Sequence, residues 1–179
     1  SSRYLKNFDE KIDQIKELSN HNKIIRVMPN TPAQVSKGMS VWKSTNEVST
    51  EEKELAISML NSFGKSLEAE SEDIIDTATA LSGSGPGFIY KFLESLILAG
   101  KKSGLTDSMS YNLAKETLIG SSELLRVSNK TPKELREAVT SPGGTTEAGL
   151  DFLEENKIEE IIIGTIKAAI DRSIKLSKE

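Results

Sequence analysis

Apolar residues recur along this chain with two different spacings, and the change between them divides the chain into two parts. Up to about residue 71, short apolar runs alternate with helical patterns: helices are predicted over 8–18 and 49–63, and strands over 23–28, 39–42 and 66–70. Beyond that point only helical spacing occurs, over 74–103, 108–126, 131–139 and two further segments, the last at 158–176. We therefore expect a mainly α fold class, with a small α/β piece (1–72) before an all-helical domain (73–179).

Two helix starts carry strong local signals. Ser49 is followed three residues later by Glu52, which is the pattern of a capping box. Thr131 has the same relation to Glu134, and Pro132 occupies the first helical position. Both pairs predict that a helix begins at that point.

The helix expected over 74–103 is apolar around most of its circumference. Phe88, Phe92 and Leu96 form one row at helical spacing, and a second row of Ile and Leu lies beside it. Only a narrow polar stripe remains. We expect this helix to be buried on several sides, as at the centre of a bundle or of a helical dimer.

The α/β piece is small for an independent fold. Parallel sheets normally contain more than three strands and carry helices on both faces. We therefore interpret residues 1–72 as the remnant of a larger α/β domain whose beginning is missing from this chain.

Composition excludes several classes of function. The 179 residues carry a net charge of −4, with both signs mixed along the helices, so neither a nucleic acid nor an anionic membrane is an expected partner. Cysteine is absent and His21 is the only histidine, which argues against disulfides, cysteine nucleophiles and a metal site. No apolar run approaches about 18 residues and no signal peptide opens the chain. These features favour a cytoplasmic protein.

The richest chemical signal is the turn Thr140–Thr146, with the sequence Thr-Ser-Pro-Gly-Gly-Thr-Thr, directly before a helical pattern. The first amides of a helix lack partners within it and carry the positive end of its dipole, so glycines at this point favour the binding of a small anion such as a carboxylate. Plain helix capping by Thr145 or Thr146 is an equally good alternative. Glu147 opposes an anion unless its side chain points away.

Two other segments have competing interpretations. In Ser82–Gly87 the glycines alternate and Pro86 interrupts the G-x-G-x-x-G pattern, so a glycine-rich break in a helix is favoured over a dinucleotide loop. Asn30 and Thr31 follow a predicted strand, where α/β sheets bind ligands, and could face a cofactor. A rigid turn without a ligand is the somewhat favoured alternative there.

Three motifs together resemble the pyrroline-5-carboxylate reductase family. They are Arg26–Pro32 (RVMPNTP), Thr79–Pro86 (TALSGSGP) and Val139–Thr146 (VTSPGGTT), in the family's order and with suitable spacing. The resemblance implies reduction of the cyclic imine pyrroline-5-carboxylate to L-proline, the last step of proline biosynthesis, with NADPH or NADH held by an N-terminal Rossmann domain. It also implies a C-terminal helical domain, like that of 6-phosphogluconate dehydrogenase, which forms homodimers that can assemble into decamers.

The resemblance further implies the residues of the site. The substrate-binding set is Val139, Ser141, Gly143, Gly144, Thr145 and Thr146. Within it Thr146 matches the threonine whose hydroxyl contacts the ring nitrogen and is the catalytic candidate, while Val139 corresponds to a contact across the dimer. Asn30 and Thr31 fall at the edge of the cofactor cleft. Ala138 stands where some members have an Asn, so we expect no cofactor contact from this position on the strength of the resemblance.

The chain departs from the family at its front, where no glycine fingerprint is present. We expect the cofactor to be bound mainly by the missing N-terminal part, and this chain alone to bind it poorly. Two other functions remain open: a non-catalytic helical oligomerisation module, and a related imine or β-hydroxyacid dehydrogenase. The sequence does not distinguish NADPH from NADH or give an oligomeric state beyond the dimer.

Overall fold

The computed structural model describes residues 11–177 of the chain. The chain divides into two compact units, Ser1–Gly87 with Gly164–Glu179, and Phe88–Ile163. The predicted helix over 8–18 is α1, Ile12–Ser19, and residues 8–10 of that prediction lie outside the described part. The boundary expected after residue 72 stays a prediction.

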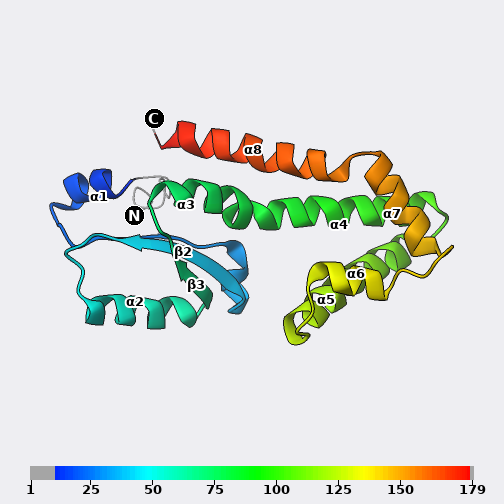
Figure 1. Ribbon diagram of the computed structural model, residues 1–179, viewed down its shortest axis with the longest axis horizontal. Helices are drawn as coiled ribbons and strands as arrows, with labels where there is room; N and C mark the ends of the chain where they lie inside the picture. The colour runs from blue at the N-terminus through cyan, green and yellow to red at the C-terminus, as the bar shows by residue number, and fades with distance from the viewer. Residues whose placement is uncertain (1–10, 178–179) are drawn as a thin grey trace. The chain divides into compact units, whose positions relative to one another are not determined.

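The first unit contains a three-stranded mixed sheet. Its strands are β1 (Ile25–Met28), β2 (Gly38–Ser44) and β3 (Gly64–Glu68), in the order β1-β2-β3. β1 runs antiparallel to β2, and β2 runs parallel to β3. Helix α2 (Thr50–Asn61) lies on one side of the sheet, and α1 and α3 (Asp73–Ala78) lie on the other (Figure 1). The Ser49 capping box is confirmed at the start of α2, where Ser49 N donates to Glu52 Oε2 at 2.8 Å.

The core of this unit joins the sheet to α3. Val41 of β2 and Ala69 pack with Ile75 of α3, whose side chain is fully buried. Beside this cluster Arg26 is 4% exposed and pairs with Glu72 at 3.0 Å and with Asp76 at 3.8 Å. The α3 carboxylate Asp76 also accepts a hydrogen bond from a serine of the last helix, so it connects the sheet to the C-terminal segment of the same unit.

The single helix predicted over 74–103 is three elements. α3 is followed by a π-helical turn, η2 (Thr79–Gly83), and then by α4 (Gly85–Lys102). The interruption falls in the glycine-rich segment, so the interpretation as a break between helices is confirmed. The element directly before it is the helix α3 and not a strand.

The remaining helices agree with the sequence pattern. They are α5 (Asp107–Val127), α6 (Pro132–Ala138), α7 (Thr145–Glu155) and α8 (Ile158–Leu176). The Thr131 capping box is confirmed at α6, where Thr131 N donates to Glu134 Oε2 at 2.7 Å. α4 and α5 approach closely, because a Cβ on Gly100 would lie 2.9 Å from Ser110 Oγ. None of the helices in the described residues is long and apolar enough to cross a membrane.

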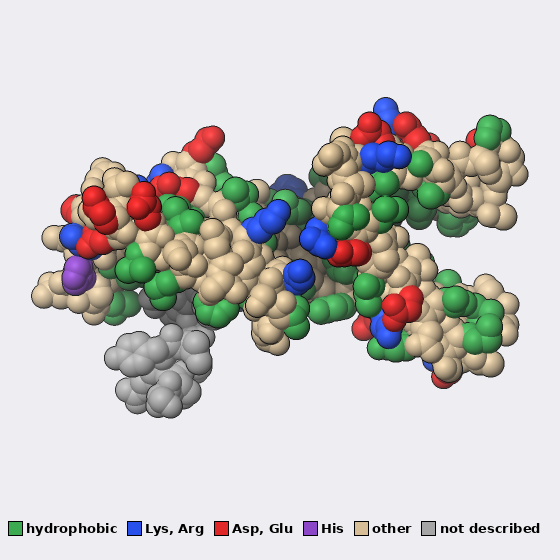
Figure 2. All heavy atoms as spheres, turned by 90° about the horizontal axis from the view of Figure 1, so that it is seen from below, with side chains coloured by type: hydrophobic (Ala, Val, Ile, Leu, Met, Phe, Trp, Pro, Cys, Tyr) green, Lys and Arg blue, Asp and Glu red, His purple; other side chains and the backbone are tan. Residues whose placement is uncertain are grey.

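The burial expected for the segment 74–103 is not provided to α4 by a bundle within one copy, and its burial in a helical dimer stays a prediction. No residue of α4 is buried, and Phe92 is 52% exposed. Apolar side chains of the second unit are also exposed on other helices: Leu113, Ile119, Leu124, Phe152, Ile161, Ile162 and Ile163. Apolar surface interspersed with charged groups is visible in Figure 2. The apolar pattern is therefore not satisfied by contacts within one copy.

Candidate functional site

The turn between α6 and α7 has a defined backbone path. α6 ends at Ala138, and Thr140 Oγ1 donates to the Arg136 carbonyl at 2.7 Å, which satisfies one of the last carbonyls of that helix. The turn then closes through the Gly144 N–H, which donates to the Ser141 carbonyl at 2.9 Å. α7 begins at Thr145, one residue later.

Two adjacent positions of this turn require glycine. Gly143 has φ of 70°, in the left-handed region that residues with a Cβ rarely adopt. At Gly144 an added Cβ would lie 2.5 Å from Ser141 Oγ and 2.8 Å from the Ser141 carbonyl oxygen. The turn is therefore tight, and its two glycines place no side chain in front of the first amides of α7.

The residue that caps α7 is Gly144, and no side chain caps the helix there. The alternative in which Thr145 or Thr146 acts as the N-cap is therefore wrong, because both threonines lie inside the first turn of α7. Their amides have no acceptor within the helix and lie at its N-terminus, which is the positive end of the helix dipole. This end of α7 can hold a carboxylate by backbone donors alone.

The Glu147 side chain forms a hydrogen bond within the turn. Its carboxylate turns back onto the turn, where Oε2 accepts from the Gly143 N–H at 2.7 Å. Two donors of the turn are thus occupied, the Gly143 N–H by Glu147 and the Gly144 N–H by the Ser141 carbonyl. The amides of Thr145 and Thr146 are available to an acid. The Glu147 side chain therefore does not point away from the turn, and its negative charge stays beside this helix end. The spacing of four residues between Gly143 and Glu147 allows the bond but does not select it.

The structure brings most of the predicted substrate residues together. Ser141, Gly143, Gly144, Thr145 and Thr146 lie in one turn and the first residues of one helix. Val139 lies just before them, at the end of α6, and its side chain is 65% exposed. Their roles toward a substrate stay predictions.

The predicted cofactor residues belong to the first unit. Thr31 is exposed and begins the short 3-10 helix η1 (Thr31–Val35) after β1. Asn30 precedes it, and its side chain is engaged within the protein: Oδ1 accepts from Met39 N at 2.9 Å, and Nδ2 donates to the Ser82 carbonyl at 3.2 Å. Nothing in the sequence pattern indicates either contact, and a role of Asn30 or Thr31 toward a cofactor stays a prediction.

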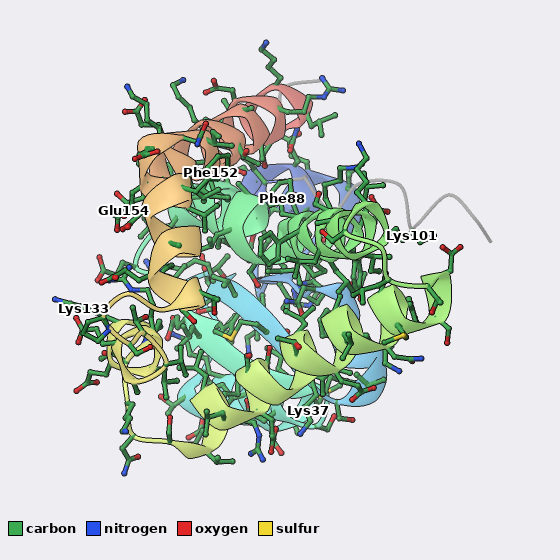
Figure 3. The ribbon with its side chains drawn as sticks, turned by 90° about the vertical axis from the view of Figure 1, so that its right-hand side faces the viewer. Lys37, Phe88, Lys101, Lys133, Phe152 and Glu154 are labelled. Carbon is green, nitrogen blue, oxygen red and sulfur yellow. The ribbon has the colours of Figure 1, made fainter. Side chains whose placement is uncertain are left out.

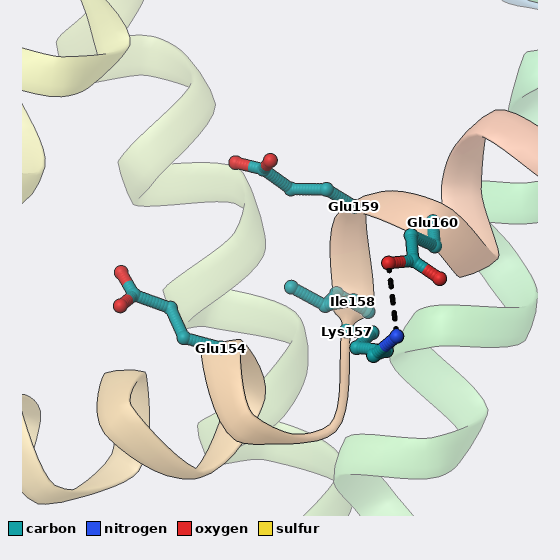
Figure 4. A pocket seen from close by; sticks show the side chains of 5 residues that line it. All are labelled: Glu154, Lys157, Ile158, Glu159 and Glu160. Atoms are coloured by element: carbon teal, nitrogen blue, oxygen red, sulfur yellow. Dashed lines mark ion pairs between the residues drawn. The ribbon is translucent and has the colours of Figure 1, made fainter.

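A separate hollow of about 290 Å³ lies at the junction of α7 and α8. Figure 4 shows its lining of Glu154, Lys157, Ile158, Glu159 and Glu160, with Lys157 and Glu160 paired at 3.2 Å. Figure 3 shows Glu154 and Phe152 on the same helix, α7. Three carboxylates against one ammonium group give this hollow a negative charge, so it does not suit an acidic ligand.

Comparison with known proteins identifies the relatives of this chain. Residues 72–176 match the family described as pyrroline-5-carboxylate reductase dimerisation. The chain is 37% identical to the pyrroline-5-carboxylate reductase of Pisum sativum over 167 residues, which covers 93% of this chain and 61% of that protein.

Solved structures agree with this match. The pyrroline-5-carboxylate reductase of Coxiella burnetii superposes with a TM-score of 0.91 at 34% identity, covering 96% of this chain and 64% of that one. The pyrroline carboxylate reductase of Plasmodium falciparum, solved with NADP bound, gives 0.85 at 36% identity, covering 94% and 64%. This chain thus spans somewhat less than two thirds of the length of these relatives. It belongs to the pyrroline-5-carboxylate reductase family.

Proposed function

We propose that the protein containing this chain reduces 1-pyrroline-5-carboxylate to L-proline with NADPH or NADH, and that this chain supplies its substrate-binding and dimerising part. The observation that carries the proposal is the start of α7. There a glycine-capped helix end offers the amides of Thr145 and Thr146 without a capping side chain, in a chain of the reductase family.

The chemistry suits this arrangement of groups. When bound, the reduced nicotinamide would supply the hydride that the carbon of the substrate's C=N bond takes up, and a proton from solvent would complete the amine at the ring nitrogen. Hydride transfer to an imine requires a fixed orientation of the ring rather than a strong general base. The amides of Thr145 and Thr146 anchor the carboxylate, and the Thr146 hydroxyl hydrogen-bonds to the ring nitrogen. Ser141 lines the same turn, with Gly143 and Gly144 giving the ligand access.

The cofactor proposal rests on one relative and on the position of two residues. The Plasmodium falciparum structure contains NADP. In this chain Asn30 and Thr31 lie just after the carboxyl end of β1, and α/β folds bind nucleotides at the carboxyl ends of strands. We place them at the edge of the cofactor site. A cytoplasmic location remains a prediction from the sequence.

The partner we propose is a second copy of this chain. A single copy leaves α4 without any buried residue and exposes Phe92, Ile162 and other large apolar side chains. Exposed apolar surface on this scale marks an interaction site. A homodimer that packs α4 and α8 of two copies together would bury it, and would carry Val139 to the partner's site. Assembly into a decamer would use further surfaces.

The first test is a hydride-transfer assay on the whole protein with pyrroline-5-carboxylate. Thr146→Val keeps the shape of the side chain but removes its hydroxyl, so turnover should fall about tenfold, since one well-placed hydrogen bond contributes about 1–3 kcal/mol. Thr146→Ser keeps the hydroxyl and should stay within about threefold of the wild type. Equal turnover in all three proteins would remove the role of Thr146.

The same assay separates the two alternatives. Reduction of a β-keto acid but not of pyrroline-5-carboxylate would identify a related dehydrogenase. A stable dimer with neither activity would identify a non-catalytic oligomerisation module.

A further inference from the structure

Two of the three family motifs meet through a single side chain. Asn30, in the motif that follows β1, donates from Nδ2 to the Ser82 carbonyl at 3.2 Å and to Ser82 Oγ at 3.3 Å. Its Oδ1 accepts from Met39 N, at the start of β2, at 2.9 Å. One half-buried amide therefore connects the loop after β1, the strand β2 and the π turn η2.

Pro86 explains why the Ser82 carbonyl needs this donor. In a continuous helix that carbonyl would accept from the amide four residues later, which is position 86, and proline has no N–H. The next amide, that of Gly87, already donates to Ser84 at 2.9 Å. A half-buried carbonyl without a donor is costly. Asn30 supplies the missing hydrogen bond from a segment 52 residues away in sequence.

Local hydrogen bonds fix the shape of the π turn itself. Ser84 N donates to the Thr79 carbonyl at 2.8 Å, five residues back, and Thr79 Oγ1 donates to the Ile75 carbonyl at 2.7 Å. On the β1 side, a Cβ on Gly83 would lie 2.9 Å from the end of the Met28 side chain. The turn is thus packed against the end of β1 as well as tied to Asn30. Single π turns within helices occur frequently at functional sites.

We propose that Asn30 is a positioning residue for the reductase reaction: it supplies the donor that Pro86 lacks, and so holds the π turn and the loop after β1 in one arrangement. This inference rests on the proposed function, because that loop is where we place the edge of the cofactor site. Asn30 acts through Ser82 and not as a direct ligand of the cofactor, since both ends of its amide are already bonded within the protein.

The proposal predicts a specific dependence on Pro86. Pro86→Ala restores an N–H at the position that a helix would use, so the Ser82 carbonyl gains a second possible donor. In the whole protein Asn30→Ala should raise the KM for the reduced cofactor about tenfold, because the hydrogen bond that orders the π turn is lost. The KM for pyrroline-5-carboxylate should stay within about twofold of the wild type. In the Pro86→Ala background the same substitution should raise the cofactor KM by no more than about threefold.

Asn156→Ala is the matched control. Its Nδ2 also donates to a helix carbonyl, that of Phe152, at 2.8 Å, but in α7. It should leave both KM values unchanged in either background. Asn30→Asp is a second variant: it keeps an acceptor for Met39 N, loses the donor and adds a negative charge beside the Ser82 carbonyl. It should raise the cofactor KM at least as much as Asn30→Ala does.

The outcomes separate this inference from the proposed function. An equal rise in cofactor KM in the wild-type and Pro86→Ala backgrounds, or no rise for either Asn30 variant, overturns the positioning role. A wild-type protein that does not reduce pyrroline-5-carboxylate refutes the proposed function. In that case urea unfolding still tests the hydrogen bond between Asn30 and Ser82, with the wild type, the two single variants and the double variant. A smaller fall in the unfolding midpoint for Asn30→Ala in the Pro86→Ala background supports the proposal, and equal falls overturn it.

Discussion

The three glycines around the start of α7 allow the geometry of the turn to be tested by one substitution at a time. Gly143 has φ of 70°, and no atom beyond its two neighbours in the chain lies within 4 Å of the place an added methyl group would take, so alanine there meets only backbone strain. At Gly144 the methyl group would lie 2.8 Å from the Ser141 carbonyl oxygen. Gly149, inside α7, has open space and ordinary helical geometry. The three positions therefore separate strain, collision and helix propensity.

The expected magnitudes follow from these contacts. Gly143→Ala should cost about 1–2 kcal/mol, the usual penalty for a left-handed residue with a Cβ. Gly144→Ala should cost about 1–3 kcal/mol, because carbon and oxygen normally stay about 3.3 Å or more apart and the turn must shift by roughly 0.5 Å. Gly149→Ala should stabilise α7 by about 0.5–1 kcal/mol.

Urea unfolding of the whole protein, followed by circular dichroism, measures all three changes. In the hydride-transfer assay Gly144→Ala should also raise the KM for pyrroline-5-carboxylate by about tenfold or more, since a displaced amide loses about 1.4 kcal/mol of binding. Gly149→Ala should leave that KM within about twofold. If Gly144→Ala unfolds at the wild-type midpoint and binds substrate normally, the tight geometry assigned to the turn is wrong.

Three further predictions concern stability. Ile75→Ala removes a fully buried side chain from the core of the first unit and should lower the free energy of unfolding by about 2–5 kcal/mol, measured by urea titration; a loss below about 1 kcal/mol would contradict that packing. Arg26→Met leaves two carboxylates without their buried partner and should cost about 3 kcal/mol, whereas Lys91→Met on the surface of α4 should change stability by less than about 0.5 kcal/mol; similar effects would show that the buried pairs contribute nothing special. Hydrogen bonds from the backbone and then the side chain of Thr131 lower the pKa of Glu134 from its ordinary value of 4.5. The ionised Glu134 therefore stabilises the fold above pH 4.5, and this stabilisation is lost as the pH falls through the lower pKa of the folded state. The difference in unfolding free energy between the wild type and Glu134→Gln should shrink from about pH 6 to about pH 3, and a constant difference would refute the assignment.

The local signals in the sequence were sufficient for most helices and strands. Capping boxes at Ser49 and Thr131 predicted where α2 and α6 begin, because both halves of such a box lie within four residues. The strands were found to within a few residues for the same reason. The glycine-rich segment predicted a break. Its π-helical shape rests on a local bond, from Ser84 N to the Thr79 carbonyl, that the pattern does not indicate, and its bond to Asn30 joins residues far apart in the chain.

The candidate site was partly predictable. The motif Thr140–Thr146 indicated a helix start with open amides, but the choice of Gly144 as the cap, with both threonines inside α7, needed the backbone angles. The turn of Glu147 back onto Gly143 depended on a side-chain rotamer that no spacing rule selects. The apolar rows of α4 predicted burial that one copy does not provide, because periodicity reports which face seeks a partner and not where the partner comes from.

The amino-acid sequence by itself determined the helical and strand segments, the tight glycine turn and the family, since each depends on residues close together in the chain or on a string of matching positions. Only the tertiary structure decided which distant groups complete one another: Asn30 with Ser82, and Arg26 with Glu72 and Asp76. A buried polar group takes whichever donor or acceptor the fold brings within about 3 Å, and sequence separation says nothing about that distance.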